Sequence, residues 1–337
     1  MIFAELIIMN LKKVLILCLC SMTTLGFCVH FFDNLIYKYN IGEKSLPSTH
    51  EKYTVNDFIE KRPKDREVST EERYNILKEL HDLNQIYSKV PLVDSDSDSH
   101  FPIKSQIVTF QAGNLPIYRF EFGNPNSQKR ILIVSGCHAG TEPLSVITAL
   151  KILKDGINQT PEQDNIYVVI YPLLNPWGFI NAQRRSEMNI DYNRVFNLTE
   201  VKDKNMKEFI DSLKGERFNL ALDLHGGPLR KAFFTIRNGD DQGLAERALK
   251  IFSDELLLPS ESGNYPGFAH YKIFPDRYLL FSRGIAETKT PGTIKAFLAQ
   301  YADFSYTLEY PGKMYRKDLE QMFPSLVYSF IQNLPIM

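Results

Sequence analysis

A histidine and a glutamate that follow an apolar run are the residues in this chain most able to do chemistry. His138 and Glu142 lie in the segment CHAGTEP, residues 137–143, directly after the apolar residues 131–134. In an open α/β sheet, ligands bind beyond the carboxyl ends of the strands. Imidazole and carboxylate groups are also two of the ligand types that Zn²⁺ uses in proteins. The segment therefore indicates a metal site, to which other parts of the chain must add donors.

A second histidine occupies a similar position further along the chain. His225 follows the mostly apolar residues 220–224 and precedes a glycine pair, which we expect to let the backbone turn sharply after the strand. Two histidines and one carboxylate make a three-ligand zinc site whose fourth position is open for water. We therefore expect His138, Glu142 and His225 to bind one Zn²⁺.

Glu309 is the candidate general base. It follows the strand-like segment Phe-Ser-Tyr-Thr-Leu, residues 304–308, and precedes the triplet Tyr-Pro-Gly. A zinc hydrolase needs a group that takes a proton from the attacking water and passes it to the leaving group. Partial burial at the end of an apolar strand would raise the pKa of this carboxyl toward the working pH.

An arginine-rich segment, residues 175–196, is a candidate anion site. Its arginines are Arg184, Arg185 and Arg194. An arginine binds a carboxylate in a two-pronged fork, and one that lies near the metal can stabilise the oxyanion of a tetrahedral intermediate. Asp191, two residues before Asn193, is interpreted as the acceptor that orients a ligand imidazole.

Taken in order, these motifs resemble those of the M14 metallocarboxypeptidase superfamily, which comprises zinc carboxypeptidases and their desuccinylase and aspartoacylase relatives. The motifs are H-…-E, N-P-x-G, R, D-x-N-R-x-F, D-L-H-G and T-x-E. The resemblance covers roughly residues 70–315. It implies a doubly wound α/β fold with a mixed sheet, and it implies that the two histidines and Glu142 hold zinc while Glu309 is the base.

The resemblance also assigns the substrate contacts. Asn193 and Arg194 would hold the substrate carboxylate, and Arg184 or Arg185 would polarise the scissile carbonyl. One departure concerns the metal motif, because the family usually places two residues between the histidine and the glutamate and this chain places three. We expect Gly140 to absorb the extra residue in a bulged turn. The alternative is a weakened or metal-free site.

The rest of the chain alternates between apolar runs of strand length and amphipathic helical segments. We predict strands at 107–110, 117–122, 131–135, 166–171, 220–224 and 304–308, and helices at 71–90, 142–154 and 206–213. Ser69 and the glutamates that follow it form a capping box for the first helix. This alternation predicts an α/β fold with a doubly wound, mixed but mainly parallel sheet that has helices on both faces.

The N-terminal segment differs in composition from the rest of the chain. Lys12 and Lys13 precede a mostly apolar stretch, so residues 1–32 are predicted to be a signal peptide or a membrane anchor. Residues 33–67 are polar and form a predicted linker or collar. Residues 68–337 form one predicted zinc hydrolase domain.

Charge and cysteine content narrow the function classes. The chain has 39 basic and 40 acidic residues, so no excess of positive charge indicates a nucleic-acid partner. Cys137 is the only cysteine after residue 28. We expect it to be a small buried residue whose side chain points away from His138, because neighbouring residues on a strand point to opposite faces.

The sequence thus predicts an exported zinc carboxypeptidase that hydrolyses an amide bond next to a free carboxylate in peptides or cell-wall peptides. One alternative is an N-acyl amino acid deacylase of the desuccinylase type, which the short spacing of 87 positions between His138 and His225 favours. Another is a pseudoenzyme that binds carboxylates without a metal, although such a protein would not need Glu309. The oligomeric state does not follow from the sequence.

Overall fold

The computed structural model describes residues 68–88, 103–157, 165–196, 201–227, 232–239, 241–258, 280–287 and 291–335. The predicted signal peptide or anchor and the predicted linker lie outside these residues. Within the described ranges, none of the helices combines the length and the apolar character that crossing a bilayer requires.

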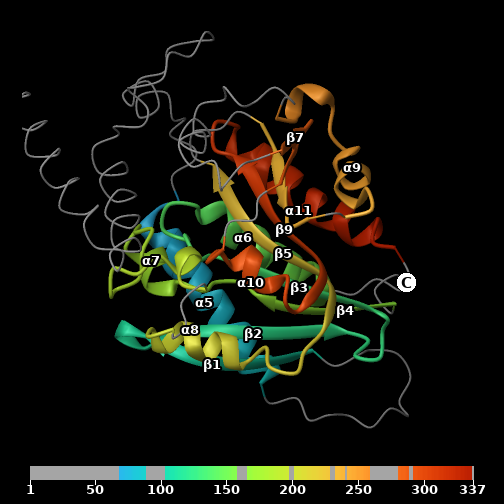
Figure 1. Ribbon diagram of the computed structural model, residues 1–337. Helices are drawn as coiled ribbons and strands as arrows, with labels where there is room; N and C mark the ends of the chain where they lie inside the picture. The colour runs from blue at the N-terminus through green and yellow to red at the C-terminus, as the bar shows by residue number, and fades with distance from the viewer. Residues whose placement is uncertain are drawn as a thin grey trace, which may run out of the picture.

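In the described part of the chain, nine strands form one sheet in the order β1-β2-β4-β3-β5-β9-β6-β8-β7 (Figure 1). The strands are β1 (Lys104–Gln111), β2 (Leu115–Gly123), β3 (Lys129–Ser135), β4 (Ile166–Tyr171), β5 (Phe218–Gly227), β6 (Phe234–Arg237), β7 (Leu280–Ser282), β8 (Ile285–Glu287) and β9 (Ala302–Pro311). The four central strands β4, β3, β5 and β9 run parallel. Antiparallel pairings join β2 to β4 on one side and β6 to β9 on the other.

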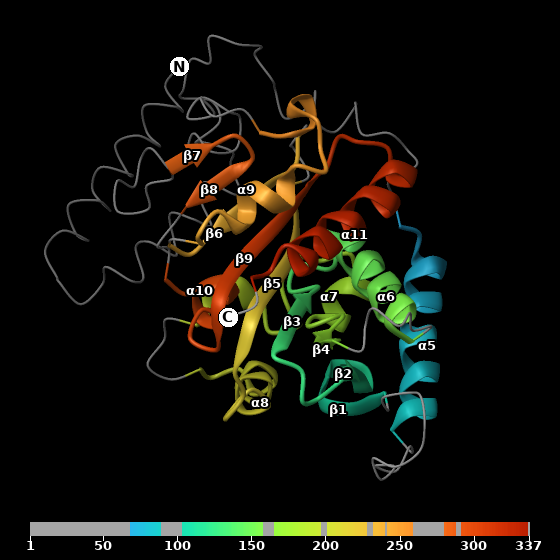
Figure 2. The ribbon, with the colours of Figure 1, turned by 90° about the vertical axis from the view of Figure 1, so that its right-hand side faces the viewer.

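Helices cover both faces of this sheet, and Figure 2 shows α5, α6 and α11 on one side with α8 and α10 on the other. The helices are α5 (Thr70–Tyr87), α6 (Pro143–Ile157), α7 (Pro176–Ile180), α8 (Lys204–Asp211), α9 (Leu244–Leu249), α10 (Ile294–Leu298) and α11 (Arg316–Gln332), with short 3₁₀ turns η2 (Ala112–Asn114), η4 (Tyr192–Arg194) and η5 (Asp254–Leu256). Alternate residues of the central strands enter one of two separate hydrophobic clusters. The larger cluster includes side chains of α5, α6, α9 and α11, and the smaller one includes side chains of α8 and α10. The doubly wound, mixed and mainly parallel sheet is therefore confirmed.

Strand order places the site. The chain passes from β3 to β4 on one side of β3 and later returns with β5 on the other side. The carboxyl ends of β3 and β5 therefore flank the point where the winding reverses, which is the usual ligand position in such sheets. The predicted metal ligands follow β3 or lie near the end of β5.

All the predicted strands and helices are present, but every predicted strand except β4 is longer than its apolar run indicated. β5 continues through His225 and both glycines, and β9 continues through Glu309. The prediction that the glycine pair makes a sharp turn after the strand was wrong. Gly226 instead gives room to a neighbour, because a Cβ atom there would lie 2.1 Å from the Tyr310 ring.

Candidate active site

The turn between β3 and α6 brings His138 and Glu142 onto one side. The backbone N–H groups of Thr141 and Glu142 both donate to the His138 carbonyl oxygen, each over 3.0 Å. This is one turn of helical geometry, in which residues four apart lie above one another. The extra residue of the motif is therefore accommodated by a helical turn, and both side chains point toward β5.

Glu142 joins the two imidazoles. Its Oε2 lies 2.9 Å from Nδ1 of His225 and accepts the backbone N–H of Gly226 over 3.0 Å. Its Oε1 lies 3.2 Å from Nδ1 of His138. All three side chains are buried. The predicted ligand set thus converges in the interior of the protein.

Each imidazole meets a second carboxylate with its other ring nitrogen. Nε2 of His138 lies 2.8 Å from Oδ1 of Asp191, and Nε2 of His225 lies 3.0 Å from Oδ2 of Asp223. A carboxylate on one ring nitrogen fixes the orientation of the ring and leaves the other nitrogen for a metal. The position of Asp191 agrees with the role predicted for it.

Asp223 was missed by the sequence reasoning. It precedes His225 by two positions on β5, and residues two apart on a strand lie on the same face. That spacing in the segment Asp-Leu-His was the signal that could have revealed it.

The donor set fits zinc. Within the described part of the chain, Nδ1 of His138 is buried without a hydrogen-bond partner, although it lies 3.2 Å from Oε1 of Glu142. Zinc bonds of ~2.0–2.1 Å in tetrahedral geometry place ligand atoms about 3.3 Å apart. The Nδ1–carboxylate distances of 3.2 and 2.9 Å are close to that separation. Two imidazole nitrogens and one carboxylate could therefore hold the ion with small adjustments.

Electrostatics keep the carboxylates ionised. Burial raises the pKa of Glu142, but the two imidazoles outweigh it and hold that pKa well below its usual range. The pKa of Asp191 is likewise well below its usual range, because His138 and Arg184 outweigh the effect of burial. The site therefore concentrates negative charge around the two imidazoles.

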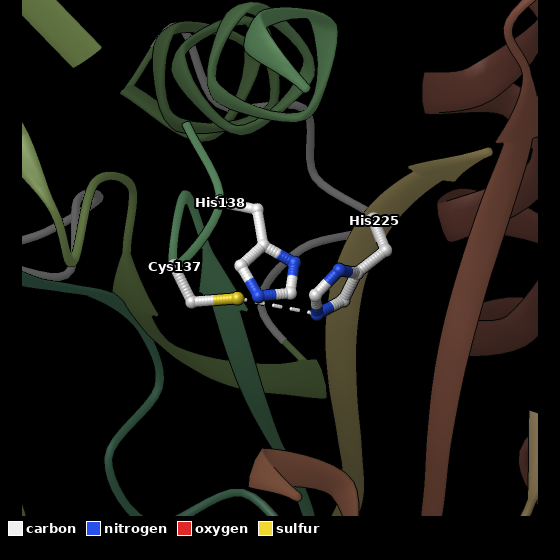
Figure 3. Close-up of side chains that lie close together, drawn as sticks. All are labelled: Cys137, His138 and His225. Atoms are coloured by element: carbon white, nitrogen blue, oxygen red, sulfur yellow. Dashed lines mark hydrogen bonds between the residues drawn. The ribbon is translucent and has the colours of Figure 1, made fainter. Parts of the chain in front are cut away.

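Cys137 also belongs to the site, and the prediction that it points away from His138 was wrong (Figure 3). Cys137, His138 and His225 form a group whose ligand atoms lie within 4.8 Å of one another, and the Cys137 sulfur lies 3.3 Å from Nε2 of His225. Strand alternation does not apply here, because β3 ends at Ser135. The expected burial of Cys137 is confirmed.

The imidazole pair therefore has two candidate donor sets, one with Glu142 at the Nδ1 atoms and one with Cys137. The set with Glu142 fits a metal better, because Asp191 and Asp223 already bind the Nε2 atoms. A metal at Nε2 would have to displace those carboxylates.

The structure separates the two adjacent arginines. Arg184 donates from Nη1 to Oε1 of Glu142 over 3.3 Å and from Nε to Oδ2 of Asp191 over 3.2 Å. Arg185 instead donates to the carbonyl oxygen of Asn189 over 3.0 Å, in an exposed position. Arg184 is thus the arginine that the fold brings to the candidate metal ligands.

Asn193 and Arg194 lie beside the site in η4, and their observed contacts are with the protein itself. Oδ1 of Asn193 accepts the backbone N–H of Ile294 over 2.8 Å, and its Nδ2 lies 3.5 Å from Nε2 of His225. Arg194 donates to the Asn193 carbonyl oxygen over 2.6 Å. Asn193 therefore connects η4 to α10 as well as to the site.

Glu309 lies on β9 directly beside His225 on β5, in the register of the two parallel strands. Neighbouring strands are about 4.8 Å apart, and residues in register point to the same face. Glu309 is half-buried. The candidate base and a candidate metal ligand thus leave the same face of the sheet at the same level.

Comparisons with known proteins support this architecture. A family model described as a protein of unknown function (DUF2817) matches residues 118–211, which is less than a third of the chain. No curated protein matches the sequence significantly.

Solved structures show similarity over most of the chain. A candidate metallopeptidase from Shewanella amazonensis has a TM-score of 0.56 at 16% identity, covering 80% of this chain and 95% of its own. A metallo-carboxypeptidase from Burkholderia cenocepacia has a TM-score of 0.55 at 14% identity, covering 79% of this chain and 69% of its own. Thrombin activatable fibrinolysis inhibitor has a TM-score of 0.52 at 12% identity, covering 83% of this chain and 80% of its own. At these identities the similarity shows the fold, and the predicted carboxypeptidase-like fold is confirmed.

Proposed function

We propose that this protein is a zinc-dependent carboxypeptidase that hydrolyses an amide bond next to a free carboxylate. One observation carries the proposal: Glu142 lies within 3.2 Å of Nδ1 of both His138 and His225, while a second carboxylate lies against Nε2 of each ring. These contacts support a three-ligand metal site in which the second carboxylates orient the imidazoles.

The bound zinc would polarise the scissile carbonyl and lower the pKa of the attacking water. His138, Glu142 and His225 would hold the ion. The Glu309 carboxylate would accept a proton from the attacking water at one Oε atom and deliver it to the nitrogen of the leaving amine. Its place in register with His225 supports this role.

The arginines would handle the negative charges of the substrate. Arg184, already beside Glu142, would stabilise the developing oxyanion. Arg194 would exchange its bond to the Asn193 carbonyl oxygen for the terminal carboxylate of the substrate, and the Asn193 amide would assist.

We also propose that the N-terminal segment determines where the reaction takes place. If residues 1–32 export the protein as a signal peptide or anchor it to a membrane, peptides or cell-wall peptides are the substrates it would meet. The basic residues ahead of the apolar stretch support this part of the proposal.

A substrate panel tests the proposal. Purified protein is analysed for zinc and then given matched peptides with a free or an amidated C-terminus, together with N-acyl amino acids, with and without a chelator. We expect about one zinc per chain, chelator-sensitive release of C-terminal residues, and strong discrimination against the amidated peptide. Preference for acyl amino acids would instead favour a desuccinylase-type deacylase, and a metal-free, inactive protein would indicate a pseudoenzyme.

Arg194→Ala tests the carboxylate contact. A charge-assisted hydrogen bond contributes ~1.5–3 kcal/mol, so we expect kcat/KM on free peptides to fall roughly ten- to a hundredfold. Arg185→Ala is the matched control, because the Arg185 guanidinium donates to the Asn189 carbonyl oxygen. Equal hydrolysis of free and amidated peptides by the wild type would contradict the carboxypeptidase assignment.

A further inference from the structure

A buried arginine on the N-terminal helix reaches the metal-binding turn from outside the site. Arg73 of α5 is 6% exposed, and its guanidinium donates to three backbone carbonyl oxygens. The acceptors are those of Val68 over 3.1 Å, Phe179 over 2.5 Å and Gly140 over 3.2 Å. The guanidinium also lies over the Phe179 ring, 5.0 Å from its centroid. Among the described residues, no carboxylate forms an ion pair with Arg73.

Gly140, whose carbonyl oxygen accepts one of these bonds, is the residue expected to absorb the extra position between His138 and Glu142. Gly140 lies between His138 and Glu142, in the helical turn that presents both side chains. Because a buried cation is costly without partners, the carbonyl oxygens that satisfy Arg73 are held firmly in return. Arg73 thereby stabilises the conformation of the turn that the extra residue requires.

The same glycine is pressed against the segment that carries Arg184. A Cβ atom at Gly140 would lie 2.1 Å from the carbonyl oxygen of Gln183 and 2.4 Å from that of Gly178. The Gln183 N–H in turn donates to the Gly178 carbonyl oxygen over 2.8 Å. The metal turn and the loop that leads into Arg184 are therefore in direct backbone contact.

Arg73 connects these two segments through its own bonds. One nitrogen binds the metal turn at Gly140, and another binds the end of α7 at Phe179. Arg184 links the same two segments a second time, because it binds Glu142 at the end of the metal turn. Only a planar fork with several N–H donors can reach carbonyl oxygens on three segments at once.

We propose that Arg73 is a positioning residue that sets the distance between the metal-binding turn and the Arg184 loop, and so maintains the zinc affinity of His138 and Glu142. This inference rests on the proposed metal site. In this proposal, α5 supplies no metal ligand but contributes to metal binding through Arg73.

Zinc affinity tests the proposal without any substrate. Zinc Kd is measured by chelator competition on the full chain for wild type, Arg73→Met and Arg73→Lys. Mutations that disturb ligand orientation typically weaken metal binding 10–100-fold, and we expect an increase of about that size for Arg73→Met. Arg73→Lys keeps the charge but lacks the fork, so its Kd should lie between the two.

Arg119→Met is the matched control. Arg119 is 5% exposed and also donates to a backbone carbonyl oxygen, that of Ser212, but it lies away from the metal turn. We expect this variant to lower the thermal midpoint while its zinc Kd stays within about twofold of wild type. An Arg73→Met protein with wild-type zinc affinity, or an Arg119→Met protein with an equally raised Kd, would overturn the proposal.

Two further outcomes are decisive. If Arg73→Met does not fold, Arg73→Lys decides, and an unchanged Kd in that variant overturns the proposal. If wild type binds zinc but hydrolyses none of the substrates, the carboxypeptidase function fails while the Kd comparison still decides the role of Arg73. A wild type that binds no zinc overturns both proposals.

Discussion

Two clusters of charged side chains lie at opposite ends of the parallel strands. The carboxyl-end cluster is buried, whereas in the amino-end cluster Arg119 is buried and the other three residues are partly exposed. At the amino end, Arg130 near the start of β3 binds Glu216, which lies two residues before β5, over 3.0 Å. Arg119 binds the same Glu216 over 2.7 Å and Glu121 over 2.9 Å. Two guanidinium groups therefore meet two carboxylates.

At the carboxyl end, three carboxylates surround two imidazoles. Glu142, Asp191 and Asp223 are each buried, and Arg184 is the guanidinium in contact with them. Among the described residues, two buried polar atoms of this cluster have no hydrogen-bond partner: Nδ1 of His138 and Oδ1 of Asp223. No side-chain atom of the four residues in the amino-end cluster is in that state.

The difference supports the proposal that the carboxyl-end cluster binds a metal, whereas the amino-end cluster stabilises the fold. Natural proteins leave few buried polar atoms unsatisfied, so those that remain indicate a missing partner. Imidazoles that bind a metal are neutral, and in that state three carboxylates against the Arg184 guanidinium leave an excess of negative charge that a divalent cation would balance. In the amino-end cluster, two guanidinium groups already match two carboxylates. Both clusters are rich in charge, so charge alone would not have distinguished them.

Removing a candidate zinc ligand should change the carboxyl-end cluster most. In His225→Ala we expect zinc Kd to rise on the order of a hundredfold or more and hydrolysis to fall to background, because a catalytic site cannot retain the ion well with two protein ligands. Metal analysis and chelator competition measure the effect. His81→Ala is the control, since His81 on α5 binds the Tyr118 hydroxyl away from the site. Full zinc occupancy in His225→Ala would show that the ligand set is wrong.

Glu309→Gln should lower kcat by ~10²–10⁴-fold while zinc binding stays unchanged, because the amide cannot accept the proton. Steady-state kinetics and metal analysis on the same preparation test this. Glu287→Gln is a matched control, since Glu287 is also a half-buried strand residue and binds Arg237. A Glu309→Gln protein that keeps more than about a tenth of the wild-type rate would remove Glu309 from the mechanism.

One pair of variants compares the carboxyl-end cluster with the amino-end cluster directly. Asp223→Asn should raise zinc Kd about 10–100-fold, because the amide orients the His225 ring less well than the carboxylate does. Glu216→Gln should leave zinc Kd unchanged and lower the free energy of unfolding by roughly 2–3 kcal/mol, since it takes a carboxylate from the buried Arg119 in a partly exposed cluster. Chelator competition and denaturant titration measure the two quantities. If both variants changed zinc Kd equally, the distinction between the ends would be lost.

The smallest expected effect concerns Lys295, a buried cation on α10. Burial lowers its pKa to about 8, although Asp223 and Glu287 act to raise it. Between pH 8 and the ordinary lysine pKa, the folded protein loses this proton while the unfolded chain keeps it. Stability should therefore rise with pH in that window relative to Lys295→Met, by at most about 3 kcal/mol. Denaturant titrations of both proteins at several pH values measure the difference, and parallel pH profiles would contradict it.

Much of the fold was readable from the sequence because its signals are local. Apolar runs of strand length separated by amphipathic helices predicted the parallel sheet, and Ser69 caps the first helix as expected by accepting the N–H of Glu72. The strand ends were harder to predict. Polar residues such as His225 and Glu309 continue their strands because backbone pairing between β5 and β9 does not depend on side-chain polarity.

For the site, the residue types that follow the predicted strands were enough to predict that His138, Glu142, His225 and Asp191 act together, and the fold brings these four side chains into contact. The choice between Arg184 and Arg185, the contact of Cys137 with the imidazoles, and the links made by Asp223 and Arg73 were decided only by the tertiary structure. These are contacts between segments far apart in the chain, or directions of side chains in irregular turns. No local periodicity encodes them, because they arise only when the sheet, the turn and α5 pack together.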